Sequence, residues 1–139
     1  MPLQDRERIL FIGNSITDTG RNRDVPQPNQ PGALGCGYAL FTAARLLADH
    51  CGRQLEIYNR GVGGHTTAQG LDRFQEDVLP LLPGLVLLEF GFNDANTRDW
   101  ARKTRVGIDE FAANLAEFHR AITERGGRSA FILNHTIDR

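Results

Sequence analysis

Apolar residues gather in four short runs along the chain, and longer mixed or glycine-rich stretches separate these runs. Each run has the length of a buried strand, and turn-forming or polar residues bound it. The runs are Ile9–Ile12, Leu55–Tyr58, Leu85–Phe90 and Ala130–Leu133. The pattern therefore predicts four strands.

Three stretches between the runs repeat apolar residues every three or four positions, which is typical of a helix with one buried face. They span Tyr38–His50, Thr66–Leu82 and Ile108–Arg125. The third has acids in its first turn, where the helix dipole favours them, and a Gly-Gly pair ends it. Two other stretches, Arg21–Gly37 and Thr97–Arg105, are predicted to be loops.

Strands and helices alternate in this prediction, in the order β-α-β-α-β-α-β. Such alternation is typical of a parallel sheet with right-handed crossovers and helices on both faces. The length of 139 residues fits one domain, and we find neither an internal repeat nor a linker. We therefore expect a single α/β domain over residues 1–139.

Composition narrows the classes of function. Hydrophobic residues make up 40% and charged residues 24%, as in soluble globular proteins, and the net charge of −1 argues against nucleic acid as a partner. No apolar stretch approaches the ~20 residues of a membrane span, and the first residues lack the pattern of a signal peptide. Because the sequence shows neither a membrane span nor a signal peptide, we expect a cytoplasmic protein. Cys36 and Cys51 form no CxxC pair and no histidine is spaced from them for a zinc site, so we expect reduced thiols and no metal site.

Polar or glycine-rich segments follow the first three strands directly. They are Gly13–Thr17, Asn59–Thr66 and Gly91–Asp94. Because the carboxyl ends of parallel strands lie at one edge of the sheet, these segments converge there. Ser15 is a candidate nucleophile, and the backbone N–H groups of Ser15 and Gly64, with the Asn93 amide, are candidate donors to an oxyanion. Asp94 is predicted to be an acceptor that fixes its loop.

These three segments resemble the conserved blocks of the SGNH (GDSL-type) hydrolases, a family of serine esterases and lipases. Gly13-Asn14-Ser15-Ile16 resembles the Gly-Asp-Ser-Leu block, the segment ending at Gly64 resembles the oxyanion-glycine block, and Gly91–Asp94 resembles the Gly-x-Asn-Asp block. The resemblance implies a three-layer α/β/α, flavodoxin-like domain with strand order 2-1-3-4, incomplete at its C-terminus. It also implies ester hydrolysis through an acyl-Ser15 intermediate, with a small-molecule ester as substrate and no cofactor.

The chain departs from this family at two places. Asn14 stands where the family has aspartate, and no Asp-x-x-His block, which carries the family's catalytic base, occurs anywhere in the sequence. A serine hydroxyl is a poor nucleophile without an adjacent base. His65, beside Gly64, and His135, just past the fourth strand, are the two candidate substitutes.

The sequence leaves three alternatives open, of which the first two follow from the missing Asp-x-x-His block. The chain is a truncated fragment or pseudoenzyme that binds acyl or acetyl-sugar ligands without turning them over. Alternatively, a partner chain pairs with the exposed edge of the fourth strand, as in a homo-oligomer, and supplies the missing strand and base. A flavodoxin-like module that binds a phosphate ligand at the hydroxyl-rich segment Ser15–Thr19 is the third.

Overall fold

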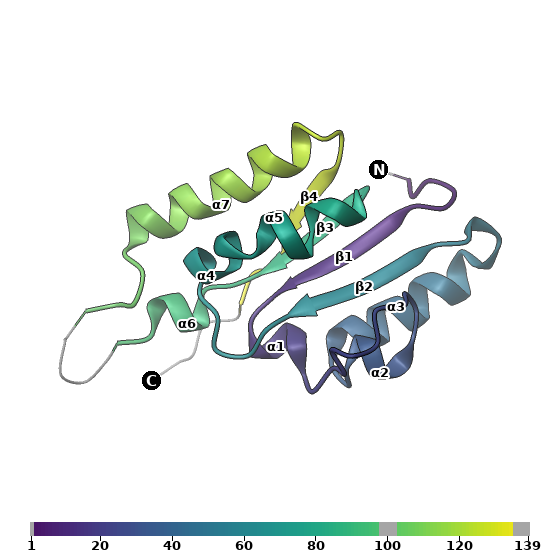
Figure 1. Ribbon diagram of the computed structural model, residues 1–139, viewed down its shortest axis with the longest axis horizontal. Coiled ribbons are helices and arrows are strands. Elements are labelled where there is room, and N and C mark those ends of the chain that lie inside the picture. Colours follow the sequence, from purple (N-terminus) through teal and green to yellow (C-terminus); the bar gives the residue numbers. More distant parts are fainter. Residues whose placement is uncertain (1, 98–102, 135–139) are drawn as a thin grey trace.

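The computed structural model describes residues 2–97 and 103–134, and a parallel sheet lies at its centre (Figure 1). Its strands are β1 (Arg8–Gly13), β2 (Glu56–Gly61), β3 (Leu85–Glu89) and β4 (Arg128–Phe131). They pair in the order β2-β1-β3-β4, and every pairing is parallel. The predicted strand order and the α/β class are therefore confirmed.

Helices cover both faces of this sheet (Figure 1). The helices are α1 (Ser15–Asp18), α2 (Pro31–Leu34), α3 (Tyr38–Asp49), α4 (Thr67–Asp72), α5 (Phe74–Asp77), α6 (Phe92–Ala95) and α7 (Ile108–Thr123), with 3-10 turns η1 (Cys51–Arg53) and η2 (Leu79–Leu81). Helices α4, α5 and α7 pack on one face, and α2 and α3 pack on the other.

The central strands supply side chains to both layers because successive residues of a strand point to opposite faces. Leu10 and Ile12 of β1 pack with Phe74, Val78 and Phe118 under α5 and α7. The intervening residues Ile9 and Phe11 pack with Leu34, Ala39 and Ala43 under α2 and α3. The four side chains of the run Ile9–Ile12 are fully buried, which explains why this run is apolar throughout.

The predicted helix Thr66–Leu82 is wrong as one element, because the structure divides it into α4, α5 and η2. Pro80 lacks a backbone N–H, so it cannot continue the hydrogen bonding of an α-helix, and here it begins a 3-10 turn. Leu82 then adopts a left-handed conformation (φ 46°), which ends the segment. Its spaced apolar residues still reach the core, as Phe74 and Val78 do.

Other boundaries also differ from the prediction. β2 runs on to Gly61, so Asn59 and Arg60 belong to the strand rather than to the segment after it. The predicted loop Arg21–Gly37 contains the short helix α2, with Pro31 at its first position, where a missing N–H costs nothing. β4 begins two residues earlier than predicted, and within the loop Thr97–Arg105, residues 98–102 lie outside the described residues.

Candidate active site

Ser15 is the first residue of α1 and directly follows the buried strand β1. The Asn14 side chain caps this helix by accepting a 2.8 Å hydrogen bond from the Ile16 N–H, which fixes the turn that carries Ser15. Ser15 is exposed, and its hydroxyl has no hydrogen-bond partner among the described residues. The hydroxyl is therefore open to a substrate at the carboxyl edge of the sheet.

Gly64 lies in the loop between β2 and α4, and this loop passes against Ser15. A Cβ added at Gly63 would stand 3.9 Å from the Ser15 Cβ. The neighbouring amides are all engaged, because Val62 N–H donates to the Gly13 carbonyl and Gly63 N–H to the Asp18 carboxylate. The two amides after Gly64 donate as well, to the Val62 carbonyl and the Gln69 side chain.

The Gly64 N–H itself has no acceptor within the described ranges 2–97 and 103–134. Gly64 has a φ of 81°, a conformation that favours glycine, and its carbonyl accepts a 3.0 Å hydrogen bond from Arg105. The hydrogen bond from Arg105 therefore fixes the carbonyl of Gly64, while the N–H of Gly64 remains available to a ligand. Such an amide is the kind of donor that an oxyanion hole needs.

Asn93 and Asp94 are in α6, directly after β3. The Asn93 Nδ2 donates a 3.0 Å hydrogen bond to the His65 carbonyl, and because a carboxamide has two N–H bonds, a second one remains for a ligand. Asp94 is buried and accepts from the Thr67 N–H (2.8 Å) and hydroxyl (2.5 Å) and from the Gly91 N–H (3.2 Å). The predicted role of Asp94 as an acceptor that fixes its loop is confirmed.

His65 is held in a state that does not suit a base. Its Nδ1 accepts a long, 3.4 Å hydrogen bond from the Nε of Arg73, so the lone pair of that nitrogen faces a cation. Burial lowers the pKa of His65 below its ordinary value, and the charges of Arg73, Arg23 and Arg105 lower it further. Both effects disfavour uptake of a proton by this imidazole.

The second candidate base, His135, lies outside the described residues. The residue before it, Asn134, is described, and its Nδ2 donates a 2.8 Å hydrogen bond to the Phe90 carbonyl at the end of β3. The chain therefore returns to the same edge of the sheet as Ser15 and Asn93 directly before position 135.

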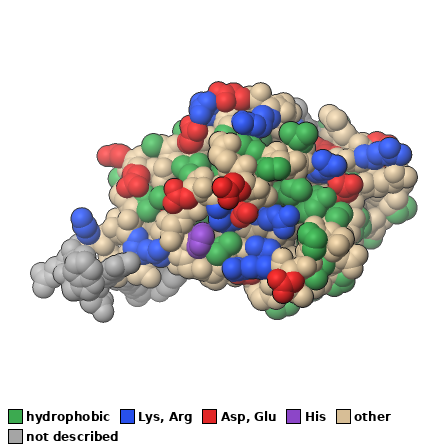
Figure 2. Space-filling model, viewed as in Figure 1, with side chains coloured by type: hydrophobic (Ala, Val, Ile, Leu, Met, Phe, Trp, Pro, Cys, Tyr) green, Lys and Arg blue, Asp and Glu red, His purple; other side chains and the backbone are tan. Residues whose placement is uncertain are grey.

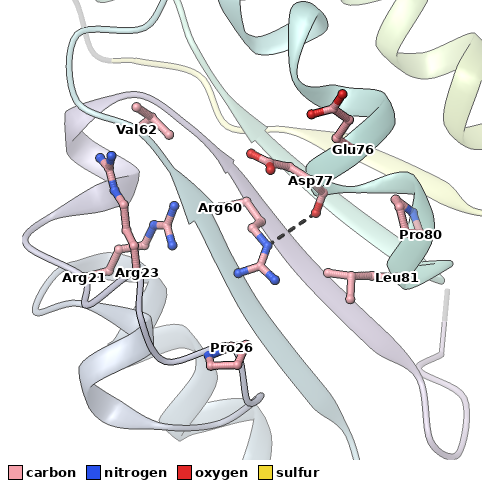
Figure 3. Close-up of a pocket in the computed structure, with 9 residues that line it drawn as sticks. All are labelled: Arg21, Arg23, Pro26, Arg60, Val62, Glu76, Asp77, Pro80 and Leu81. Atoms are coloured by element: carbon pink, nitrogen blue, oxygen red, sulfur yellow. Dashed lines mark hydrogen bonds between the residues drawn. The ribbon is translucent and has the colours of Figure 1, made fainter.

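A cavity of about 420 Å³ lies between the α1–α2 loop, β2 and α5, and arginines and acids both line it, whereas Ser15, Gly64 and Asn93 do not (Figure 3). Arg21, Arg23 and Arg60 come from the α1–α2 loop and from β2, and Glu76 and Asp77 come from α5. Basic and acidic side chains are interspersed on this face of the molecule (Figure 2). Because charges of both signs face the cavity, its charge alone does not select an anionic ligand.

Asp18 ties α1 to the Gly64 loop. Its carboxylate accepts from Arg23 (2.7 Å) and from the Gly63 N–H (3.1 Å). Burial disfavours the ionised form, but the hydrogen bonds from Arg23 and from Gly63 outweigh it and lower the pKa of Asp18. The charge of Asp18 therefore stabilises the connection between the two loops of the site.

We expect Asp18→Asn to lower the free energy of unfolding at pH 7, and the difference from wild type to shrink in acid. A lowered native pKa gives stability that is present above the ordinary value of 3.8 and is lost as the pH falls through the native value. Urea unfolding at pH 7 and pH 3 measures this difference, with Asp24→Asn, an exposed acid nearby, as the control. A difference that stays constant with pH would rule out the charge as its source.

Glu89 is the residue of this edge that the sequence analysis missed. It is the last residue of β3, only 1% exposed, and it lies opposite Gly13 in the register of the sheet. The signal was present, because Glu89 is a lone acid inside the apolar run Leu85–Phe90. A charged side chain at such a position is rarely buried without dedicated partners.

The described residues contain neither a metal-binding cluster nor a membrane-spanning helix. No three His, Cys, Asp or Glu side chains there gather into a cluster that could hold a metal ion. No helix in the same part of the chain is long and apolar enough to cross a lipid bilayer.

Comparisons with known proteins agree on one family. The model of the GDSL-like lipase/acylhydrolase family matches residues 11–137. Acetylxylan esterase from Geobacillus stearothermophilus is 33% identical over 118 residues, which are 83% of this chain and 53% of that protein. The isoamyl acetate-hydrolyzing esterase 1 homolog of Mus musculus is 32% identical over 79% of this chain and 39% of its own length.

The solved structures lead to the same conclusion. The crystal structure of Axe2, an acetylxylan esterase from Geobacillus stearothermophilus, superposes with a TM-score of 0.84 and 30% sequence identity. The match covers 94% of this chain and 61% of Axe2. This chain therefore spans only part of the length of its relatives, about half in the case of the acetylxylan esterase sequence.

Proposed function

Because the chain belongs to the GDSL-like lipase/acylhydrolase family, we propose that it hydrolyses carboxylic esters through an acyl-Ser15 intermediate. The observation that carries the proposal is the Gly64 N–H, which has no acceptor in the described part of the chain although its neighbouring amides are all engaged, beside an exposed serine hydroxyl. A donor held without a partner next to a nucleophile suits a charge that develops only during the reaction.

In the proposed reaction, the Ser15 Oγ attacks the ester carbonyl carbon and loses its proton to a base. The carbonyl oxygen becomes an oxyanion, which accepts hydrogen bonds from the Ser15 and Gly64 N–H groups and from the second N–H of Asn93. Collapse of this intermediate releases the alcohol and leaves the acyl group on Ser15. Water then hydrolyses the acyl-enzyme and regenerates the serine.

This mechanism needs a base that takes the proton from Ser15. The Asp-x-x-His block is absent from the sequence, and the contact with Arg73 disfavours His65. We propose His135 as the first residue to test, because Asn134 directly before it lies at the edge of the sheet that carries Ser15. A histidine from a partner chain that pairs with β4 is the other source, and light scattering that finds only monomers would exclude it.

We propose short acyl esters, acetyl esters first, as the substrate class. Two relatives are named for acetate esters, an acetylxylan esterase and an isoamyl acetate-hydrolyzing esterase homolog. These relatives differ in the alcohol that their names specify, so the acetyl group is the part of the substrate that the relationship supports.

The experiment is hydrolysis of p-nitrophenyl acetate by the purified chain beside its Ser15→Ala variant. Turnover that depends on Ser15 would support the proposal. Equal rates for the two proteins would contradict it, because the hydrolysis would then not pass through the serine.

We expect Asn93→Ala to lower kcat by about 100-fold with a small change in KM, since loss of one oxyanion donor typically costs this much. Asn96→Ala, at an exposed asparagine three residues on, is the matched control and should keep its activity. Steady-state kinetics of both variants on p-nitrophenyl acetate make the comparison. A kcat of Asn93→Ala within twofold of wild type would remove Asn93 from the oxyanion hole.

A second candidate function is binding of acyl or acetyl-sugar ligands without turnover. The observation that favours it is that no histidine forms a hydrogen bond with the Ser15 hydroxyl among the described residues. Isothermal titration with an acetylated xylo-oligosaccharide distinguishes the two candidates. Binding without Ser15-dependent hydrolysis would support the binding function, and efficient turnover would exclude it.

A further inference from the structure

Glu89 is a buried acid without a cation. It is 1% exposed, and no Arg, Lys or His forms an ion pair with it in the described part of the chain. Burial raises the pKa of its carboxyl group, although hydrogen bonds from Thr17, Asn14 and Asn134 oppose that shift. A buried carboxyl group is costly unless its oxygens find donors, so the identity of these donors shows what Glu89 holds in place.

The two closest donors stand on either side of the candidate nucleophile. Asn14 Nδ2 donates to Glu89 Oε1 at 3.2 Å, and the Thr17 hydroxyl donates to Oε2 at 3.1 Å. Asn14 and Thr17 flank the Ser15-Ile16 pair in the sequence. Glu89 thus holds both ends of the turn that presents Ser15, although no hydrogen bond joins it to Ser15 itself.

The hydrogen bonds around Glu89 have defined donors and acceptors. The Thr17 hydroxyl has one hydrogen, which it gives to Glu89, so the Tyr38 hydroxyl at 2.9 Å must donate to Thr17. The Asn14 amide uses both of its ends, because Nδ2 donates to Glu89 while Oδ1 accepts from the Ile16 N–H. Aspartate at position 14 would place two carboxylates in contact, whereas glutamine at position 89 would have to donate to the Thr17 hydroxyl, which would then have to donate to Tyr38.

We propose that Glu89 is a positioning residue for Ser15, matched to the amide at position 14, an inference that rests on the proposed ester hydrolysis. The chain has an asparagine where the related Gly-Asp-Ser-Leu block has aspartate, and Glu89 supplies the carboxylate from the neighbouring strand. A carboxylate at position 14 would instead lie about 3 Å from that of Glu89, a separation at which two like charges cannot both ionise.

The test is a cycle of Asn14→Asp, Glu89→Gln and the double variant, with Glu110→Gln, an exposed acid on α7, as control. Asn14→Asp sets two carboxylates against each other and Glu89→Gln reverses the hydrogen bonds of Thr17 and Tyr38, whereas the double change restores one donor and one acceptor between positions 14 and 89. We expect each single variant to lose about tenfold or more in kcat with little change in KM, and the double variant to recover to within about threefold of wild type.

Urea unfolding of wild type, the two single variants and the double variant separates this inference from the proposed function. A matched pair requires unfolding free energies that are not additive, with the double variant more stable than the sum of the single changes predicts. If wild type shows no Ser15-dependent turnover, the proposed function fails and the unfolding cycle alone decides whether the pair is matched. Additive free energies, or a Glu89→Gln variant with wild-type kcat in an active enzyme, would overturn the inference.

Discussion

Ser15→Ala is expected to reduce hydrolysis of p-nitrophenyl acetate to the rate of the buffer, a loss of about 10³-fold or more in kcat. The substitution removes the atom that the proposed mechanism acylates, and it leaves the proposed oxyanion donors in place. Ser15 is exposed and its hydroxyl has no partner among the described residues, so the variant should fold as well as wild type.

The control for this prediction is Ser129→Ala, which removes the hydroxyl of the other serine in the chain. That hydroxyl is on β4 and lies 2.8 Å from the Nδ1 of His119, on an exposed part of the protein. Full activity in Ser129→Ala with none in Ser15→Ala assigns the chemistry to Ser15. Residual activity in Ser15→Ala of more than about a tenth of wild type would contradict an acyl-Ser15 mechanism.

Gly61→Ala is expected to lower the free energy of unfolding by about 3 kcal/mol, the upper range for an added methyl group in a packed site. A Cβ at Gly61 would stand 2.2 Å from the Asp18 N and 2.6 Å from the Thr17 carbonyl carbon. Both are backbone atoms of α1, so no side chain can rotate away to make room. Since α1 carries Ser15, the substitution should also displace the nucleophile.

The control for Gly61→Ala is Gly52→Ala in the exposed turn η1, where an added Cβ meets nothing within 4 Å. Urea unfolding should place this variant within about 0.5 kcal/mol of wild type, as for most surface substitutions. If the two glycine variants were equally stable, β2 and α1 would not pack as closely as described. Loss of activity in Gly61→Ala at a denaturant concentration where it remains folded would show that the serine has moved.

The positions of the polar segments at the strand ends were predictable from the sequence. The apolar runs before them are continuous, and the alternation of strands with helices indicates a parallel sheet. Ser15, Gly64 and Asn93 follow three neighbouring strands, and the structure places them along one edge. Their adjacency needed only topology, since the carboxyl ends of parallel strands meet. The 3-10 turn at Pro80 was also predictable from the sequence, because proline cannot continue an α-helix, whereas the earlier break at Arg73 between α4 and α5 was not.

The role of Glu89 was not predictable from periodicity. A lone acid in an apolar run shows that something unusual occurs there, but its partners Asn14 and Thr17 are more than 70 positions away in the sequence. The Arg73 contact that disfavours His65 as a base joins residues only eight positions apart, but it was not predictable either, because Arg73 lies at the break between α4 and α5 that the sequence analysis did not predict. Pairings of this kind are set by the three-dimensional packing of loops.

The open Gly64 amide connects the fold to the proposed chemistry. Its loop is held by Gly13, Asp18, Arg105 and Asn93, which come from four separate segments. An oxyanion donor works best when it is fixed before the reaction begins, because no reorganisation is then needed as charge develops. These contacts hold the loop in place around an N–H that has no acceptor among the residues that the structure describes, as a fixed oxyanion donor requires.

The most direct test is the mass of the protein after it is mixed with p-nitrophenyl acetate and quenched in acid, followed by peptide mapping. The account predicts one acetyl group, located on the peptide that contains Ser15 and absent from the Ser15→Ala variant. Acetyl groups found only elsewhere, or equal labelling of wild type and Ser15→Ala, would contradict ester hydrolysis through an acyl-Ser15 intermediate.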